Sequence, residues 1–533
     1  MNQTRFDIDD LCKEALSGIG KAEPHNQSLH NIEILLRRDP EIETHAKINI
    51  GYTVLTYLRY FGRKYDSARL CLNVVLLIID DPYIATMMVN RNILNCLKIV
   101  MDKFDQDNVI VESSFNIIEK LMNSNESYNA LMERGIIYLL VARVDTNRRS
   151  ENVVRHGLSL LRSLIIQKHM DESILTHEVY SQLIDSLYSF LLIYPENAFI
   201  SLHAVYIFSW IVEKNDKSLI ELLLKQNIFQ YIDLIVDKQR EDQCVSACFI
   251  LANQVVRCYN KNNGSKERLF EFISVSQIIR STTSLLQNVY MFDNGEMSTY
   301  MILFLSEISK SLNMTSMCVS QGIIPILINI YTSHKNKITL LTACLCFLNT
   351  IASTDTYYSM VYNQVFINSL LSTLLLYKED EKFVITCLGM IQLLAKDEEM
   401  SDYLFKKDIY SYINPLFTLY INNSTICQII VGILINIVTK GDKYVHYFLD
   451  SDIIKYISCM LFNNENNNPL IYNCLSFLLF LSYSEKGVRE ILQAGIEPFL
   501  EDLLPDSIGR GCYELCNALS IRIDMKKIDN III

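Results

Sequence analysis

Apolar residues recur at helical spacing in a sequence motif that occurs more than once along the chain; we call this motif the repeated phrase. Residues 321–331, QGIIPILINIY, place a glycine before two isoleucines and a proline, and then continue with leucine and isoleucine at helical spacing. Similar stretches occur at residues 133–144, ERGIIYLLVARV, and at residues 493–504, QAGIEPFLEDLL. Apolar residues at this spacing form one face of an amphipathic helix. Each phrase therefore predicts a helix that faces a core.

The same helical pattern returns along most of the chain. Its first apolar residues are Ile93, Ile136, Val179, Ile228, Ile278, Ile323, Phe366, Ile409, Ile453 and Ile496. Most of the intervals between them are 43 to 45 residues. The two longer intervals, of 49 and 50 residues, contain or adjoin the loop-like runs YPENA (194–198) and KNNGSKE (261–267). A fixed period of this length is the signature of stacked repeats.

Each repeat also has a second, more apolar segment that follows the first at a roughly constant distance. Several of these segments are apolar nearly all round, which in a soluble helix means burial between two other helices. Small residues lie near their starts, where they allow a neighbouring helix to approach closely. They are Gly157, Ala204, Ala247 and Ala343.

A short polar stretch precedes each phrase, which makes a unit of a short helix, a second helix and a long buried helix. This unit resembles the armadillo repeat. QGIIPIL, with Gly322 and Pro325, and QAGIEPFL, with Gly495 and Pro498, are similar to the turn between that family's first and second helices. Glycine suits a left-handed turn, and proline is tolerated in the first turn of a helix. TACLCFLNTIA (342–352) is similar to the family's third helix.

The resemblance implies an all-α fold, a right-handed superhelical solenoid of armadillo-like repeats, with HEAT repeats as the alternative. We expect residues 1–46 to form an N-terminal helical cap, because an array needs polar-faced ends. The array of about 10–11 units then covers residues 47–523, since SARLCLNVVLLIIDD (67–81) reads as a third helix before the first phrase. Residues 524–533 are expected to be a C-terminal tail.

Charge and composition narrow the classes of partner. The formal net charge is −12, which argues against phosphate binding as the main activity, so no nucleic-acid partner is expected. The first residues carry charges and lack the apolar core of a signal peptide, and the apolar runs are shorter than the ~18 residues of a membrane span. We therefore expect a soluble, cytoplasmic protein without a membrane span, with nuclear or cytoskeletal association left open. Its 15 cysteines are expected to be small core residues rather than disulfides.

Motifs for catalysis and metal binding are missing from the sequence. SGIGKAE (17–23) lacks the first glycine and the Ser or Thr of a P-loop, and no C-x-x-C pair, G-x-S-x-G or H-E-x-x-H occurs. The nine histidines are dispersed. We therefore expect no cofactor, no metal and no enzymatic activity.

The resemblance implies that polar residues of the third helices face a partner. At one position of these helices the units carry Glu119, Ser163, Trp210, Asn253, Ser306, Asn349, Gln392, Asn436 and Leu479. In family members that bind extended peptides, asparagines at this position hydrogen-bond the peptide main chain. Asn253, Asn349 and Asn436 match that pattern.

Nuclear-import adaptors of the family pair these asparagines with tryptophans that sandwich lysine stems. Here the single tryptophan, Trp210, occupies the asparagine position itself. Reading of classical nuclear localisation signals is therefore not expected. Trp210, Asn253, Asn349 and Asn436 are the candidate partner-binding residues. The alternative is that Trp210 packs between units and the asparagines cap or bridge helices.

Two further features bear on the partner. The third helices from residue 338 onward are almost free of charge, which suits a mixed or apolar segment. A basic run, RVDTNRRSENVVR (143–155), is either a docking point for an acidic partner or a solvated loop.

The function predicted from these features is a non-enzymatic scaffold or adaptor that binds a protein partner in the concave groove of the solenoid. The alternative is a regulator of armadillo type, an exchange factor for a small GTPase or a co-chaperone. The sequence leaves open the partner, the biological process, the oligomeric state, and whether the groove takes an extended peptide or a folded domain.

Overall fold

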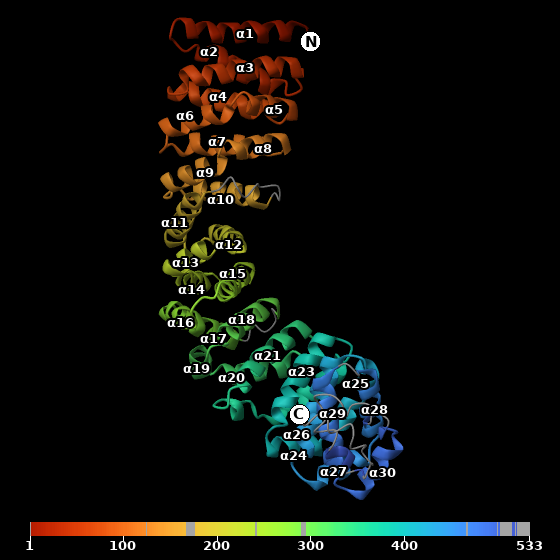
Figure 1. Cartoon of the computed structure of the whole chain (residues 1–533). Helices are drawn as coiled ribbons and strands as arrows, with labels where there is room; N and C mark the ends of the chain where they lie inside the picture. Colours follow the sequence, from red (N-terminus) through yellow and green to blue (C-terminus); the bar gives the residue numbers. More distant parts are fainter. Residues whose placement is uncertain are drawn as a thin grey trace, which may run out of the picture. The chain divides into compact units, whose positions relative to one another are not determined.

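The structure is a computed structural model, and it describes residues 2–123, 125–166, 176–239, 242–288, 295–464, 467–497, 499–500, 514–517 and 519. Its described residues contain helices and no β-strand. They fall into two compact units, residues 1–281 and 282–533. Within the first unit the helices are stacked in successive layers (Figure 1). The expected tail, residues 524–533, lies outside the described residues.

Most repeats contain three helices in a fixed order. The first, short helices are α5 (Pro82–Asn90), α8 (Asn125–Glu133), α13 (Lys217–Lys225), α16 (Lys266–Val275), α19 (Leu312–Ser320), α24 (Glu398–Lys406), α27 (Asp442–Leu449) and α30 (Glu485–Gln493). The second helices are α6 (Ile93–Lys103), α9 (Ile136–Thr146), α11 (His177–Ile193), α14 (Ile228–Lys238), α17 (Ile278–Gln287), α20 (Ile323–Ser333), α22 (Gln364–Leu376), α25 (Ile409–Tyr420) and α28 (Ile453–Asn463).

The third helices are α4 (Tyr65–Ile78), α7 (Asn108–Leu121), α10 (Glu151–Ile166), α12 (Ala198–Glu213), α15 (Asp242–Lys261), α18 (Gly295–Ile308), α21 (Ile338–Ala352), α23 (Glu381–Leu394), α26 (Ser424–Val438) and α29 (Asn468–Leu481). In the repeat of α22 the described residues form a 3₁₀ turn, η3 (Tyr358–Val361), in place of the first helix.

The second helices begin where the repeated phrase predicts. Ile93, Ile136, Ile228, Ile278, Ile323, Ile409 and Ile453 are each the first residue of their helix. Val179 and Phe366 lie two residues inside α11 and α22. In the opening phrase Pro325 is the third residue of α20, and the apolar side chains of that helix are buried. The phrase is thus a structural element of the repeat.

A left-handed residue makes the sharp turn into many second helices. Gly322 has φ +78°, and Gly135 and Gly495 have φ +74° and +69°. Asn92 and Asp408, with φ +63° and +55°, take the same place in other repeats. Asparagine and aspartate enter this conformation more readily than other residues with a side chain. The turn is therefore conserved in geometry between repeats, although glycine occurs in only some of them.

Side-chain caps fix the start of several third helices. Each cap is an Asp or Asn whose side-chain oxygen accepts from the backbone N–H three residues later. The caps are Asp107, Asn197, Asp380, Asn423 and Asn467, with distances of 2.8 to 3.2 Å. Such a cap satisfies one of the backbone donors that a helix N-terminus leaves free.

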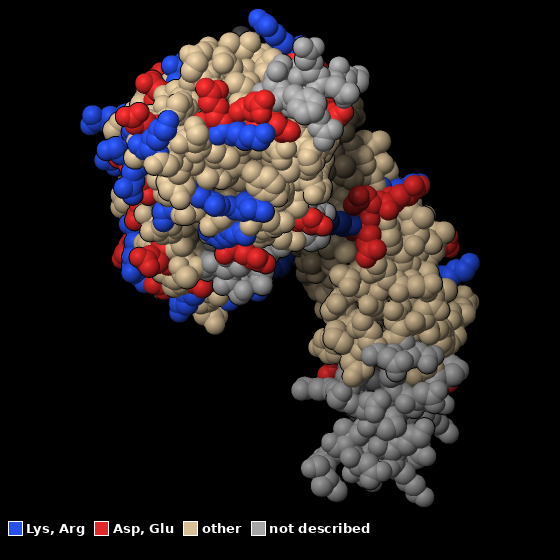
Figure 2. Space-filling view, turned by 90° about the horizontal axis from the view of Figure 1, so that it is seen from above, with Lys and Arg blue, Asp and Glu red and all other residues tan. Residues whose placement is uncertain are grey.

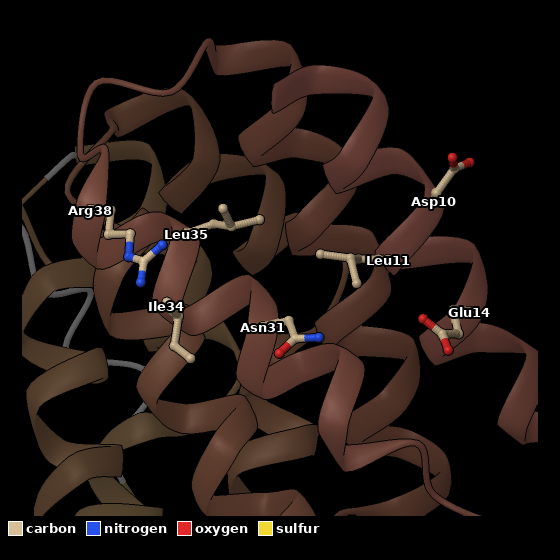
Figure 3. Close-up of a pocket in the computed structure, with 7 residues that line it drawn as sticks. All are labelled: Asp10, Leu11, Glu14, Asn31, Ile34, Leu35 and Arg38. Atoms are coloured by element: carbon tan, nitrogen blue, oxygen red, sulfur yellow. The ribbon is translucent and has the colours of Figure 1, made fainter. Parts of the chain in front are cut away.

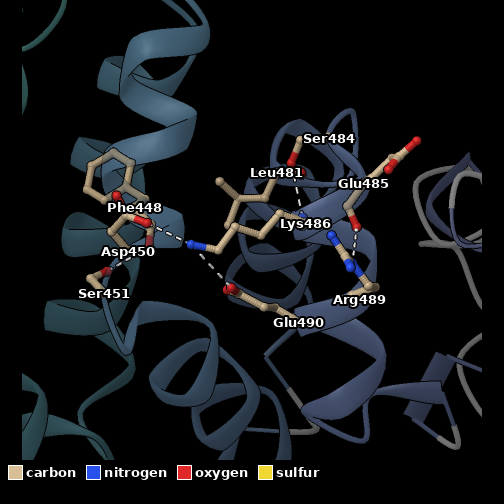
Figure 4. Close-up of polar contacts among 10 residues, drawn as sticks. Phe448, Asp450, Ser451, Leu481, Ser484, Glu485, Lys486, Arg489 and Glu490 are labelled. Carbon is tan, nitrogen blue, oxygen red and sulfur yellow. Dashed lines mark hydrogen bonds and ion pairs between the residues drawn. The ribbon is translucent and has the colours of Figure 1, made fainter.

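Successive repeats are also joined at the ends of their second helices. The side chain there donates to a carbonyl in the turn of the preceding repeat. The bonds are Gln239 to Pro195 (2.9 Å), Tyr377 to Lys335 (2.8 Å), Tyr420 to Lys378 (2.9 Å) and Asn464 to Ile421 (3.4 Å). Ion pairs link some of the short first helices to the repeat before. The ammonium of Lys486 lies 2.6 Å from Asp450 and 3.6 Å from Glu490 (Figure 4).

Three helices lie before α4. They are α1 (Asn2–Gly20), α2 (Asn26–Arg38) and α3 (Thr44–Phe61). α1 packs against α3, and α2 packs against α4. α1 and α2 therefore continue the stack of helices that follows them. The boundary expected after residue 46 falls inside α3. Every cysteine that the structure describes is free, and most are buried, as expected of small core residues.

Candidate partner-binding face on the third helices

The third helices carry the candidate residues on one side. Each position of the predicted column lies on a separate third helix, from Glu119 on α7 to Leu479 on α29. In the first unit α4, α7, α10, α12 and α15 pack one against the next, and in the second unit α18, α21, α23, α26 and α29 do the same. We call the solvent-accessible side of these helices the third-helix face.

Asn349 and Asn436 both reach the middle helix of the second unit, α23. The amide of Asn349 on α21 donates to the carbonyl of Thr386 at 3.0 Å. The amide of Asn436 on α26 donates to the carbonyl of Gln392 at 3.1 Å. These two asparagines thus bridge neighbouring third helices, which is the alternative to partner binding that the sequence left open. The carbonyl oxygen of Asn349 is buried and has no hydrogen-bond partner among the described residues.

A glycine on α26 makes room for the side chain of Gln392, and a glycine on α23 lies in van der Waals contact with Asn349. A Cβ atom at Gly432 on α26 would lie 2.1 Å from Nε2 of Gln392, and one at Gly389 on α23 would lie 3.7 Å from Nδ2 of Asn349. Sequence reasoning did not identify either glycine. The two glycines are 43 residues apart, which is one repeat period, so they occupy the same position in consecutive third helices. This spacing would have identified them in the sequence.

Asn253 and Trp210 lie on the first unit. Asn253 on α15 is buried, with 7% of its surface exposed. Trp210 on α12 is half-buried. Its ring centroid lies 5.5 Å from that of Tyr180 on α11, and the ammonium of Lys214 lies 4.9 Å from it. Trp210 therefore packs on the second helix of its own repeat.

The two units differ in the charge of this face. In the second unit α18 carries Glu296 and Glu307. α21, α26 and α29 contain no Asp, Glu, Lys or Arg, and in α23 such residues occur only at Glu381 and Lys382 in the first turn. In the first unit α7, α10 and α15 each carry charged residues of both signs. On the face shown in Figure 2, acidic and basic side chains lie close to one another and wide areas carry neither.

The basic run at 143–155 is divided between two surfaces. Arg143 on α9 pairs with Asp102 and donates to the carbonyl of Met101. Arg148 and Arg149 are exposed in the turn before α10. Arg155 lies on α10 and contacts the third helix of the next repeat. The four arginines therefore do not form one basic patch.

Open hollows occur away from the third-helix face. One, of about 480 Å³, lies on α1 and α2, where Leu11, Ile34 and Leu35 are flanked by Asp10, Glu14 and Arg38 (Figure 3). Arg38 lies at one side of the hollow and Asp10 and Glu14 at the other, with Asn31 between them, and Asp10 points away from the other side chains. This arrangement does not bring a nucleophile, a base and an oxyanion donor together.

Within the described ranges no group of three His, Cys, Asp or Glu side chains is placed to hold a metal ion. No single helix of the described part is long and apolar enough to cross a membrane. The pair α19 and α20, bent by 75°, meets that test only in combined length and composition.

Comparison of the structure with solved structures finds similar proteins, whereas comparison of the sequence does not. No family model and no curated protein matches the sequence. A structure of β-catenin, from work on a phosphorylation switch that controls its interaction with cadherin, superposes with a TM-score of 0.68 at 12% identity, covering 93% of this chain and 96% of that one.

Two structures of SYS-1 are similar to the same extent. The complex of SYS-1 with POP-1 superposes with a TM-score of 0.68 at 13% identity, and SYS-1 alone with a TM-score of 0.64 at 13% identity. Each covers 96% of this chain and 99% of the other. β-Catenin and SYS-1 are armadillo-repeat proteins. Together with the three-helix repeat, these similarities establish that the chain has the all-α, armadillo-like solenoid fold.

Proposed function

We propose that the chain is a non-enzymatic protein–protein interaction scaffold whose third-helix face binds a segment of a partner protein. The observation that carries this proposal is the nearly uncharged face of α21, α23, α26 and α29 in the second unit. Thr342, Cys346 and Thr350 on α21 and Ser476 on α29 are partly accessible there. Neutral polar and apolar groups of this kind suit a segment recognised by shape and distributed hydrogen bonds.

Aromatic side chains at the α29 end of this face offer a large apolar area that a partner could bury. Tyr472 and Tyr483 are 56% and 75% exposed, and the ring centroid of Phe480 lies 6.3 Å from that of Tyr483. Exposed aromatic groups are enriched where few residues carry most of the binding energy. SYS-1, which has the same fold, is found in a complex with POP-1, in keeping with a binding role for this solenoid.

In this proposal Trp210, Asn253, Asn349 and Asn436 mark the binding face, residues 1–46 cap the array of residues 47–523, and the protein acts in the cytoplasm. Asn349 is only partly buried, so its side chain can contact a partner segment that lies on this face. No described residue favours the exchange-factor or co-chaperone alternative, so the scaffold is the function put forward.

Replacement of Asn253, Asn349 and Asn436 by alanine tests the proposal. We expect the dissociation constant of a partner isolated with the full-length chain to rise about tenfold, because three main-chain contacts worth ~1 kcal/mol each are weakened and partly compensated by water. Isothermal titration calorimetry measures this change.

The matched control replaces three exposed asparagines of second helices, Asn95, Asn329 and Asn368, and should leave binding unchanged. Circular dichroism must show that both variants remain folded, since the first also loses the bonds to Thr386 and Gln392. Unchanged affinity in the folded Asn253, Asn349 and Asn436 variant would exclude the third-helix face as the site.

A further inference from the structure

Two arginines on α10 place their guanidinium groups over aromatic rings of the next third helix, α12. The guanidinium carbon of Arg155 is 4.9 Å from the ring centroid of Phe199, and that of Arg162 is 4.2 Å from the ring centroid of Tyr206. The rings cover one face of each guanidinium, and such stacking holds the planar group in place while its N–H edges stay available for acceptors.

His203 on α12 fixes the second of these arginines. It is only 6% exposed, and its Nδ1 lies 2.8 Å from the carbonyl oxygen of Phe199. A carbonyl accepts and cannot donate, so Nδ1 carries the hydrogen and Nε2 is the acceptor. Nε2 lies 3.4 Å from Nη1 of Arg162. Burial lowers the pKa of His203, and the Arg162 and Arg155 guanidiniums lower it further, so the ring is neutral near pH 7.

Both guanidiniums lack a carboxylate partner among the described residues. The nearby acids are engaged elsewhere, since Glu119 lies 3.5 Å from His156 and Glu151 accepts from Asn197 at 2.6 Å. The Nε atom of Arg162 is buried without a hydrogen-bond partner among the described residues. A half-buried arginine is normally paired. Arg162 is half-buried, whereas Arg155 is exposed, and neither forms an ion pair among the described residues.

We propose that Arg155 and Arg162, held by Phe199, Tyr206 and His203, bind oxyanion side chains of a partner protein segment. This inference rests on the proposed function, because it assigns a partner chemistry to the third-helix face of the first unit. Guanidinium edges match the geometry of a carboxylate or a phosphate. Two cations are too few for nucleic acid, which relies on many phosphate contacts. An acidic protein segment is therefore the partner class that fits.

Selection of random peptides on the immobilised full-length chain tests the site. We expect the wild-type chain to enrich peptides that contain Asp or Glu, and the Arg155→Ala/Arg162→Ala variant to lose that enrichment. For the best peptide, the dissociation constant should rise about tenfold or more in this variant, as expected for a charge-assisted hydrogen bond. Replacing the peptide's Glu by Gln should have a similar effect.

The control variant Arg148→Ala/Arg149→Ala removes the same charge from the exposed turn before α10 and should bind as the wild type does. The Arg155→Lys/Arg162→Lys variant keeps the charge without the planar fork and should bind with intermediate affinity. A second peptide carries phosphoserine in place of Glu. Comparing the dissociation constants of the two peptides shows whether the site prefers a carboxylate or a phosphate.

Two results separate failure of the site from failure of the proposed function. Peptides enriched equally, and with equal acidic content, on the wild-type chain and the Arg155→Ala/Arg162→Ala variant would overturn the oxyanion site and leave the binding face intact. Enrichment of no peptide by the folded wild-type chain would contradict both.

Discussion

Replacing Gly157 by leucine will destabilise the first unit by roughly 3 kcal/mol or more, a value at the upper end for an overpacked core. Gly157 lies in α10, where a Cβ atom would be 2.1 Å from Cγ2 of Val144 and 3.2 Å from Cε2 of Phe115. Both of these side chains are fully buried, so they have little room to move away. Thermal unfolding followed by circular dichroism, with limited proteolysis to locate the opened repeat, measures the effect.

Two variants show whether close approach is the cause. Asn152→Leu introduces leucine at an exposed position of the same helix and should change stability little. Val144→Ala removes the methyl group that a Cβ atom would strike, so it should recover part of the stability lost in Gly157→Ala. If Gly157→Leu unfolds at the wild-type temperature, the close packing of α10 on α9 is wrong.

Replacing Thr373 by valine will lower the free energy of unfolding by about 1–3 kcal/mol, because it leaves a buried hydroxyl without its partner. Tyr331 on α20 and Thr373 on α22 are both fully buried, and their side-chain oxygens are 2.6 Å apart. The Thr373 hydroxyl donates to the carbonyl of Ser369 at 2.9 Å, so the Tyr331 hydroxyl is the donor between the two. Burial raises the pKa of Tyr331 well above its ordinary value, which keeps it protonated.

A double-mutant cycle isolates this bond between successive repeats. Tyr331→Phe combined with Thr373→Val should cost less than the sum of the single changes, with a coupling of about 1 kcal/mol. Urea unfolding of the four proteins provides the free energies. Strictly additive effects would mean that the two hydroxyls do not interact in solution.

The repeat and its helices could be predicted from the sequence because they depend on local chemistry. Gly322 and Pro325 combine a left-handed turn with a helix start, and the apolar spacing after them requires a buried helical face. The same turn at Asn92 and Asp408 was within reach, since asparagine and aspartate tolerate positive φ. These turns contain no glycine, so a search for glycine alone does not find them.

The contacts between third helices could not be predicted in the same way. The position of Asn349 on a third helix follows from the period, but its bond to the carbonyl of Thr386 depends on how the side chain lies across two helices. Arg155 was grouped with Arg148 and Arg149 because they are neighbours in the sequence. The helix instead carries Arg155 to Phe199 of the next repeat, and such pairing across a repeat is set by tertiary packing.

Photo-cross-linking from defined positions is the most direct test of a binding role for the third-helix face. Benzoylphenylalanine would replace Tyr472 or Tyr483, which are 56% and 75% exposed on and just after α29. As controls it would replace Tyr138 on α9 or Phe462 on α28, which are 54% and 44% exposed on second helices. Binding on the third-helix face predicts cross-links to one partner protein from Tyr472 and Tyr483 and none from the controls. Cross-links from the second-helix positions alone would contradict it.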